Sequence, residues 1–253
     1  PREGNPPPRI VETPSGMLNS IGLANIGVDK YIEDKIPLYS TIGTHIIMNI
    51  AGSTMNEYEE IVRKMELLSS DIIGYEVNIS CPNVKKGGME FGVDCDLTKK
   101  LTEKLRSMTE KLLIIKLSPN VTDISTIAKS AEEGGADAVS AINTVVGMSI
   151  DIHKQKPNIF TKFSGLSGPA IRPIGIAAVY KVFQTVNIPI IGIGGITNST
   201  DVLEYMFAGA SAVQVGTANY RNPGIALSMI DELNCYIGQN KLSSITDIVG
   251  AVS

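Results

Sequence analysis

The feature that most constrains this chain is a short apolar run followed by an amphipathic helical segment, repeated six times. The apolar runs are rich in Ile and Val, and most of them lack polar alternation, which is typical of strands buried on both faces of a parallel sheet. We expect strands at residues 45–51, 73–80, 112–117, 138–142, 189–193 and 212–215. Helical periodicity is clear at residues 54–68 and 201–208, and Ser199 and Thr200 are candidate N-caps of the second helix. The pattern predicts an α/β protein.

The number of strand–helix units leaves two architectures open. A closed (β/α)8 TIM barrel has eight such units, but residues 1–44 contain no clear unit and include the proline-rich stretch 4–8. The chain is therefore either an open, doubly wound six-stranded sheet or a TIM barrel whose N-terminal strands are missing from this sequence. Residues 143–171 form a long insertion, typical of a lid over the C-terminal face of a barrel. No linker or low-complexity stretch interrupts the chain, so we expect residues 1–253 to form a single domain.

Composition argues against several classes of function. The formal net charge of -4 and the pI near 5.3 disfavour nucleic acid as the main partner. The three cysteines are irregularly spaced, which indicates a reducing cytoplasm rather than a disulfide framework. The two histidines lie far apart in the sequence, so we expect no metal site. No apolar run approaches the ~18 residues that a membrane span needs, so we expect no membrane partner.

Polar residues lie at the carboxyl ends of most of the predicted strands, at the edge where barrel enzymes carry their functional groups. They are Asn49; Asn78 with Cys81 and Asn83; Lys116; and Asn143 with Thr144. This ring offers many hydrogen-bond donors and acceptors but no carboxylate pair. It suits a planar ligand rich in heteroatoms better than a glycoside or a metal.

Two of these residues allow both a structural and a functional interpretation. Cys81, in a loop stiffened by Pro82, is either an inert buried thiol or a reactive one, and no nearby histidine would make it a protease-type nucleophile. A free thiol with a pKa of ~8.5 would act as a general base best in alkaline buffer. Lys116 ends its strand either in a salt bridge to a neighbouring carboxylate or as a cation beside an electron-rich ligand atom.

Glycines follow the last two predicted strands, at Gly194-Gly195 and Gly216-Thr217. Glycine lets backbone N–H groups approach an anion closely at the start of a helix, and phosphate sites after the last two strands recur in TIM barrels. These segments are either such a phosphate site or tight turns only.

Together these segments resemble one family. The motifs are Asn19-Ser-Ile-Gly-Leu23, Asn78-Ile-Ser-Cys-Pro-Asn-Val-Lys-Lys-Gly-Gly88, Lys116-Leu-Ser-Pro-Asn120, Ala141-Ile-Asn-Thr144, Gly165-Leu-Ser-Gly-Pro-Ala170 and Ile191-Gly-Ile-Gly-Gly195. In this order and spacing, from Pro1 to about Pro223, the chain resembles the class 1 dihydroorotate dehydrogenases. The motif wording is more similar to the NAD-linked type B subgroup than to the fumarate-linked type A.

The resemblance implies a TIM barrel that holds one FMN and oxidises dihydroorotate to orotate in de novo pyrimidine (UMP) biosynthesis. Cys81 would be the general base that removes a proton from carbon 5, while a hydride passes from carbon 6 to FMN. The implied substrate contacts are Asn19, Ser20, Ile21, Gly22, Leu23, Asn78, Asn83, Asn143 and Thr144. The implied FMN contacts are Asn49, Asn78, Lys116, Ile142, Gly168, Gly194, Gly195, Gly216 and Thr217.

The resemblance also implies partners. Type B enzymes pair a catalytic homodimer with a subunit that carries FAD and an iron–sulfur cluster, and three cysteines are too few for a cluster of this chain's own. Family members carry an opening section with a substrate-facing lysine, which we expect the active enzyme to contain. NAD through a partner and fumarate both remain open as electron acceptors. The alternatives are an enzyme like dihydropyrimidine dehydrogenase, a flavin-free phosphate-binding barrel isomerase or aldolase, and a degenerate barrel kept as a scaffold.

Overall fold

A parallel six-stranded sheet forms the core of the computed structural model, which describes residues 1–68, 70–80 and 91–252. The strands are β3 (Ile46–Ile50), β4 (Ile72–Asn78), β5 (Leu112–Lys116), β6 (Ala138–Ala141), β11 (Ile190–Ile193) and β12 (Ala212–Gln214). They lie side by side in chain order, and every neighbouring pair is parallel. All six predicted strands are confirmed, with ends that lie within two residues of the expected ones. The apolar run of the inner strand β5 is buried on both faces, at Leu113, Ile114 and Ile115.

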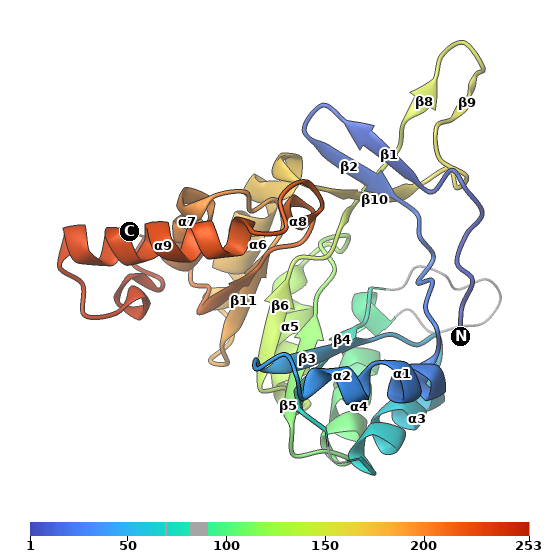
Figure 1. Cartoon of the computed structure of the whole chain (residues 1–253), viewed down its shortest axis with the longest axis horizontal. Coiled ribbons are helices and arrows are strands. Elements are labelled where there is room, and N and C mark those ends of the chain that lie inside the picture. Colours follow the sequence, from blue (N-terminus) through green and yellow to red (C-terminus); the bar gives the residue numbers. More distant parts are fainter. Residues whose placement is uncertain (69, 81–90, 253) are drawn as a thin grey trace.

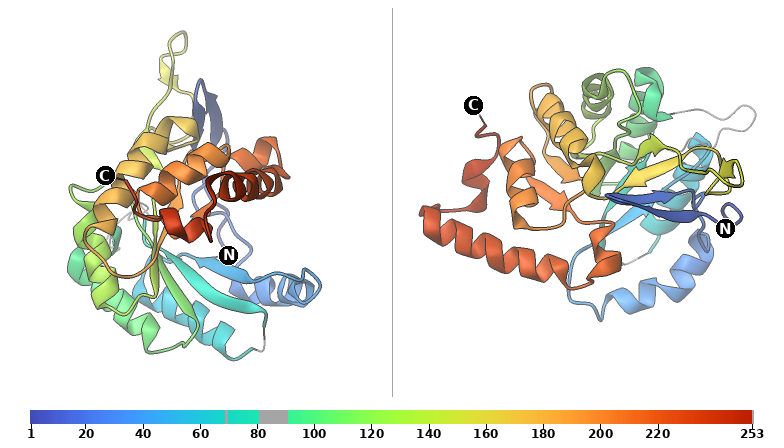
Figure 2. Two further views of the ribbon diagram at one scale, coloured as in Figure 1. Left: turned by 90° about the vertical axis from the view of Figure 1, so that its left-hand side faces the viewer. Right: turned by 90° about the horizontal axis from the view of Figure 1, so that it is seen from above.

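Five helices connect these strands along one side of the sheet (Figures 1 and 2). They are α3 (Met55–Glu66), α4 (Cys95–Arg106), α5 (Ile124–Glu133), α6 (Arg172–Phe183) and α7 (Ser199–Phe207). Each helix contacts the next one along the chain. A doubly wound sheet reverses its strand order and carries helices on both faces, whereas this order never reverses. The doubly wound alternative is therefore wrong.

The sheet is curled, as one hydrogen bond across it demonstrates. Strands in a sheet lie ~4.8 Å apart, so a flat sheet would place β12 about 19 Å from β4, four positions away. Yet Gln214 Nε2 on β12 lies 2.7 Å from Glu76 Oε1 on β4. The sheet is thus a half-barrel, in agreement with the TIM-barrel prediction. The described residues contribute six of the eight strands that a closed barrel has, and β3 and β12 form the open edges.

Side chains that accept hydrogen bonds from the first helical turn set the starts of most of these helices. Thr54, Asp94 and Asp123 have extended backbones and cap α3, α4 and α5 in this way. The prediction for α7 was wrong by one residue. Asn198 is its N-cap and accepts from the Asp201 N–H at 3.0 Å, because Ser199 is already in the helix.

The N-terminal segment and the long insertion combine into a second sheet. As expected, residues 1–44 contain no strand–helix unit of the barrel type: they form the hairpin β1 (Ile10–Thr13) and β2 (Gly16–Asn19), then α1 (Val28–Asp34) and α2 (Ile36–Tyr39). The insertion contributes β7 (Val145–Gly147), the hairpin β8 (Ile150–Asp151) and β9 (Lys156–Pro157), and β10 (Ser164–Ser167). The antiparallel order β1-β2-β10-β7 lies beyond the carboxyl ends of the parallel strands (Figure 1).

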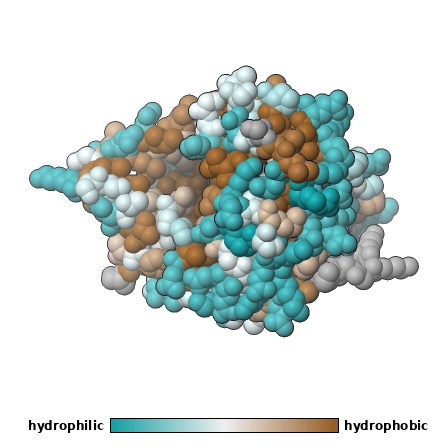
Figure 3. All heavy atoms as spheres, turned by 90° about the horizontal axis from the view of Figure 1, so that it is seen from below, coloured by the Kyte–Doolittle hydropathy of each residue, from teal (hydrophilic) through white to brown (hydrophobic). Residues whose placement is uncertain are grey.

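The C-terminal segment closes the described structure with helices. They are α8 (Ala218–Arg221), α9 (Ile225–Asn240) and the 3-10 turn η3 (Ile245–Ile248). Two further 3-10 turns lie earlier in the chain, η1 (Phe91–Val93) before α4 and η2 (Pro169–Ile171) before α6. Helix α9 fully buries only Met229 and exposes Leu227 and Ile230. Apolar side chains also gather in patches among hydrophilic ones on the face in Figure 3. Within the described residues, no helix combines the length and apolarity that crossing a membrane requires.

Candidate functional site

Two adjoining cavities open at the carboxyl ends of the parallel strands. The first has a volume of about 480 Å³ and the second of about 800 Å³. Asn19, Ile21, Asn143 and Thr144 line both cavities. The two cavities are therefore neighbours, and groups bound in them would meet at these four residues.

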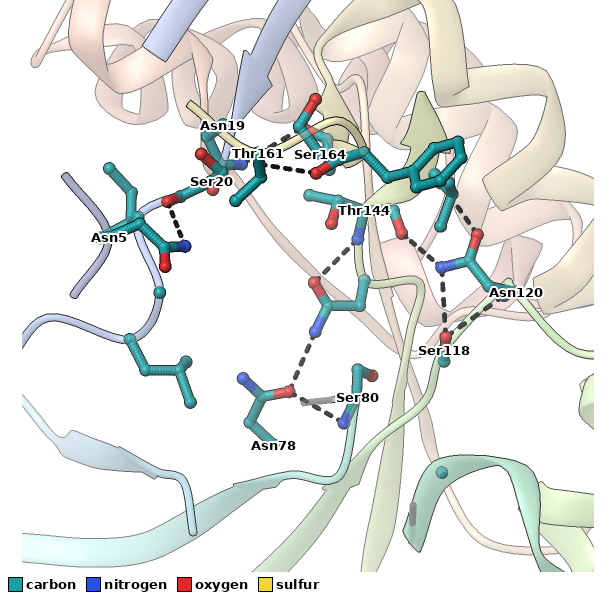
Figure 4. Close-up of a pocket in the computed structure, with 18 of the residues that line it drawn as sticks. Asn5, Asn19, Ser20, Asn78, Ser80, Ser118, Asn120, Thr144, Thr161 and Ser164 are labelled. Atoms are coloured by element: carbon teal, nitrogen blue, oxygen red, sulfur yellow. Dashed lines mark hydrogen bonds between the residues drawn. The ribbon is translucent and has the colours of Figure 1, made fainter. Parts of the chain in front are cut away.

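The first cavity collects the residues that the sequence predicted for the substrate (Figure 4). Every described member of that set lines it: Asn19, Ser20, Ile21, Gly22, Leu23, Asn78, Asn143 and Thr144. Cys81 and Asn83 lie outside the described residues. Ser80, the residue before Cys81, also lines this cavity. The described neighbour of the predicted base is thus at the predicted site.

A chain of hydrogen bonds fixes the amides at the ends of β4 and β6. Asn143 Nδ2 donates to Asn78 Oδ1 at 3.0 Å, and the Ser80 N–H donates to the same oxygen at 3.2 Å. Asn143 Oδ1 in turn accepts from the Thr144 N–H at 2.8 Å. Asn78 Nδ2 donates no hydrogen bond within the described part of the chain, so it remains available to a ligand carbonyl. The site is therefore oriented before a ligand binds.

Ser118 and Asn120 are among the polar residues of this cavity that were not predicted from the sequence. Asn120 Nδ2 donates to the Thr144 carbonyl at 2.9 Å and to Ser118 Oγ at 3.3 Å, while its Oδ1 accepts from the Val146 N–H at 2.9 Å. Asn120 thereby ties the loop after β5 to the loop after β6. Ser118 and Asn120 belong to the motif Lys116-Leu-Ser-Pro-Asn120, which supports the family resemblance. Their position just after the end of a predicted strand could have identified them as site residues.

The opposite wall comes from the N-terminal segment. Asn5, also missed, holds the loop 19–23 by donating two hydrogen bonds: its N–H donates to the Ile21 carbonyl at 3.0 Å and its Nδ2 to the Ser20 carbonyl at 2.9 Å. Gly22 has a φ of +75°, and a Cβ there would lie 2.8 Å from the Asn5 nitrogen. Only glycine therefore fits this turn without displacing Asn5.

The second cavity collects most of the residues predicted for the flavin. Those that line it are Lys116, Ile142, Gly168, Gly194, Gly195, Gly216 and Thr217. Two predicted residues are not among them. Asn78 lines only the first cavity, and Asn49, on the edge strand β3, lines neither. The Asn49 amide instead donates to Glu76 Oε2 at 2.5 Å.

The glycine turns leave backbone donors exposed to the second cavity. Gly195 has a φ of +72°, and a Cβ there would lie 2.8 Å from the Gly168 carbonyl oxygen. A Cβ on Gly216 would meet nothing within 4 Å, so open space adjoins that glycine. Neither the Gly195 nor the Gly216 N–H donates a hydrogen bond to another described residue. Such unpaired amides beside a helix start are suited to a phosphate.

A buried carboxylate contacts the Lys116 side chain that lines this cavity, and sequence reasoning missed it. Glu76 is 5% exposed and accepts hydrogen bonds from Lys116 and from three neutral side chains. Burial by itself raises the pKa of Glu76, but the Lys116 ammonium and these hydrogen bonds outweigh it and hold the pKa below its ordinary value. Lys116 thus makes the salt bridge of the structural interpretation and also lines the second cavity. The two interpretations are compatible.

Comparison with known proteins assigns the chain. A family model described as dihydroorotate dehydrogenase matches residues 1–237. The chain belongs to the dihydroorotate dehydrogenase family. Members of this family are flavin-dependent TIM barrels, which accounts for the half-barrel and agrees with the resemblance seen in the motifs.

Individual relatives are similar over almost the whole chain. The protein named "Dihydroorotate dehydrogenase B (NAD(+)), catalytic subunit" of Geotalea uraniireducens is 47% identical over 252 residues, which are 100% of this chain and 82% of the relative. Its namesake from Desulforamulus reducens is 49% identical over 251 residues, 99% of this chain and 82% of the relative. That of Thermoanaerobacter sp. is 47% identical over 252 residues, covering 100% of this chain and 83% of the relative.

Other reactive groups of this dihydroorotate dehydrogenase family member lie away from the cavities. His153 lies two residues after Asp151, whose Oδ1 accepts from the His153 N–H at 3.0 Å in an exposed turn. Cys95 begins α4 and Cys235 lies in α9, and neither lines a cavity. No group of His, Cys, Asp and Glu side chains suited to a metal ion occurs among the described residues.

Proposed function

We propose that this chain catalyses the flavin-dependent oxidation of dihydroorotate to orotate in de novo pyrimidine (UMP) biosynthesis. One observation carries the proposal: an amide-lined cavity and a glycine-lined cavity adjoin at Asn19, Ile21, Asn143 and Thr144. Hydride transfer needs the substrate and its acceptor in contact. Two cavities with a common wall meet that need.

The first cavity suits dihydroorotate. The substrate ring carries amide N–H donors and carbonyl acceptors, and asparagine side chains supply both complements. Asn78 and Asn143 are held in place by each other, and Asn120 stabilises the loop that carries Thr144. We propose that these amides, with Asn83, read the ring, while the segment 19–23 binds the carboxylate through its backbone N–H groups and the amide of Asn19.

The second cavity suits FMN, which we propose as the flavin. Its glycine turns offer unpaired N–H groups for a terminal phosphate, and Lys116 offers a cation for the isoalloxazine end. When bound, FMN supplies a two-electron acceptor. Ile142 and Gly168 would contact it along its length, and Thr217, whose Oγ1 donates to Ser167 Oγ at 2.8 Å, would stand beside the phosphate.

Cys81 is the proposed general base. It directly follows Ser80, whose N–H donates to Asn78 Oδ1 in the first cavity. As a thiolate it would take the proton from carbon 5 while the electron pair of that bond forms the ring double bond. Because an ordinary thiol has a pKa of ~8.5, we expect activity to rise with pH through the alkaline range.

Partners and location are part of the proposal. The relatives are named catalytic subunits of an NAD(+) enzyme, which supports a second subunit as the partner. We propose that the chain forms a homodimer and passes electrons to a subunit that carries FAD and an iron–sulfur cluster. With three cysteines, the chain cannot itself supply the four ligands such a cluster usually takes. We propose that residues 1–253 act as one flavin-binding domain in the cytoplasm.

Anaerobic visible spectroscopy tests the proposal. Purified protein should be yellow, release FMN on denaturation, and bleach when dihydroorotate is added, with orotate formed. Dihydrouracil should not bleach the protein. If dihydrouracil bleaches it to the same extent as dihydroorotate, the alternative of an enzyme like dihydropyrimidine dehydrogenase is correct. Colourless protein that binds no FMN would instead favour a flavin-free barrel enzyme or a scaffold.

A pair of cysteine variants tests the base. Cys81→Ala should retain flavin but no longer be bleached by dihydroorotate at neutral pH, because the carbon 5 proton has no acceptor. Cys95→Ala, a matched change outside both cavities, should bleach like the unaltered protein. Undiminished bleaching in Cys81→Ala would remove Cys81 from the role of base.

A further inference from the structure

Glu76 joins five strands of the half-barrel through its carboxylate. Its Oε1 accepts from Ser140 Oγ on β6 and from Gln214 Nε2 on β12, each at 2.7 Å. Its Oε2 accepts from Asn49 Nδ2 on β3 at 2.5 Å and from Lys116 Nζ on β5 at 3.2 Å. The three neutral donors hold the carboxylate, and the carboxylate in turn holds the ammonium.

The Lys116 ammonium depends on this partner for its position. Its side chain is 15% exposed, and Glu76 is its one salt-bridge partner within the described residues. A lysine stem has four carbons and many rotamers, so one fixed contact decides where the charge lies. Without the carboxylate, the Lys116 side chain has no fixed partner and would turn toward water.

We propose that Glu76 is a positioning residue that keeps the Lys116 ammonium aimed at the flavin cavity. This inference rests on the proposed function, because Lys116 matters to the reaction only if a flavin occupies that cavity. A fixed cation there favours the electron-rich reduced flavin. Glu76 would therefore tune the reduction potential through Lys116, although it touches neither flavin nor substrate itself.

The direction in which Glu76→Gln shifts the flavin reduction potential distinguishes a positioning role from two simpler roles of Glu76. If Glu76 acts only as a negative charge near the flavin, Glu76→Gln makes the potential more positive. If Glu76 only ties strands together, the variant is less stable but its potential does not change. If Glu76 positions Lys116, the cation is lost with it and the potential becomes more negative, as it does in Lys116→Gln.

The experiment is a double-mutant cycle on the flavin-loaded protein, with the potential as its readout. Glu76→Gln and Lys116→Gln should each shift the potential in the negative direction, and the double variant should match Lys116→Gln alone. Glu66→Gln is the matched control, since Glu66 pairs with Lys111 at 3.6 Å at the far end of β5 and outside both cavities. It should leave the potential unchanged. The inference is overturned if Glu76→Gln shifts the potential in the positive direction or does not shift it. It is also overturned if Glu76→Gln shifts the potential of the Lys116→Gln variant as much as that of the unaltered protein.

A second measurement needs no flavin, so failure of the proposed function and failure of this inference remain distinguishable. Acetic anhydride acetylates free amines, and mass spectrometry gives the rate at each lysine of the flavin-free protein. Lys116 should react several-fold faster in Glu76→Gln than in the unaltered protein, and an unchanged rate contradicts the positioning role. If Glu76→Gln does not fold, Glu76→Asp keeps the charge but withdraws it by one methylene, and both readouts should move in the same direction by less.

Discussion

Replacing Tyr205 by Phe should weaken both the fold and flavin binding, because its hydroxyl anchors the glycine turn of the second cavity. Tyr205 lies in α7 and is fully buried, and its Oη donates to the Gly194 carbonyl at 2.7 Å. The ring packs against Gly192, where a Cβ would lie 2.5 Å from it. Burial raises the pKa of Tyr205 above its ordinary value, so the hydroxyl remains a donor throughout the working pH range.

The magnitude follows from what the hydroxyl leaves behind. The lost hydrogen bond itself contributes ~1 kcal/mol, and an unpaired buried carbonyl costs ~1–3 kcal/mol when water cannot replace the donor. We therefore expect the free energy of unfolding to fall by about 1–3 kcal/mol. If flavin binding must restore the original turn at a cost of ~1.4 kcal/mol, flavin affinity falls about tenfold.

The assay is urea unfolding of the flavin-free protein together with flavin titration. Tyr180→Phe is the matched control. Tyr180 on α6 is 42% exposed, so this variant removes the same hydroxyl group at the surface. Its free energy of unfolding should change by no more than ~0.5 kcal/mol. Equal stabilities of the two variants would refute the anchoring role of Tyr205, and a destabilised Tyr205→Phe with unaltered flavin affinity would separate the turn from the flavin site.

Three further perturbations test other parts of the site. Gly216→Val should unfold like the unaltered protein but bind flavin less tightly in titration, because its side chain enters open space at the second cavity. Gly195→Ala should lower the free energy of unfolding in urea more than Gly43→Ala does. The φ values are similar, +72° and +69°, so backbone strain costs ~1–3 kcal/mol in both variants. Only at Gly195 would the added Cβ also meet close neighbours. Acid should reduce the stability difference between the unaltered protein and Glu76→Gln. The folded-state pKa of Glu76 is lowered, so its stabilisation is full above an unfolded pKa of ~4.3 and is lost as pH falls through the folded value, which urea unfolding at several pH values will measure.

The strands and cavity walls could be predicted because their signals are local. The β5 run Leu112–Lys116 is apolar without alternation, and a strand buried on both faces requires such a run. Strand ends then placed Asn78 and Asn143 on one edge, and parallel order brought them together. The capping error at α7 is equally local: Asn198, Ser199 and Thr200 are all good caps, so sequence alone could not choose among them.

The residues that were missed depend on contacts between distant segments. Asn5 reaches Ser20 only because the β1–β2 hairpin returns the chain to it, and nothing near Asn5 in sequence encodes that return. Glu76 did leave a signal. It lies two residues before Asn78 within β4, and the period of two in a strand directs both side chains to the same face. A carboxylate inside an apolar strand, in phase with a predicted ligand residue, is a recognisable pattern.

The polar interior of the half-barrel explains why these charges are there. TIM-barrel interiors are normally packed with branched apolar side chains, but here Glu76, Lys116, Ser140 and Gln214 meet inside the curl. Replacing a buried ion pair by apolar residues is often neutral or stabilising, so such a pair is poorly explained by stability alone. The second cavity opens directly onto Lys116. The role proposed for Lys116, a cation that faces the flavin and is held in place by a buried anion, would account for the whole cluster.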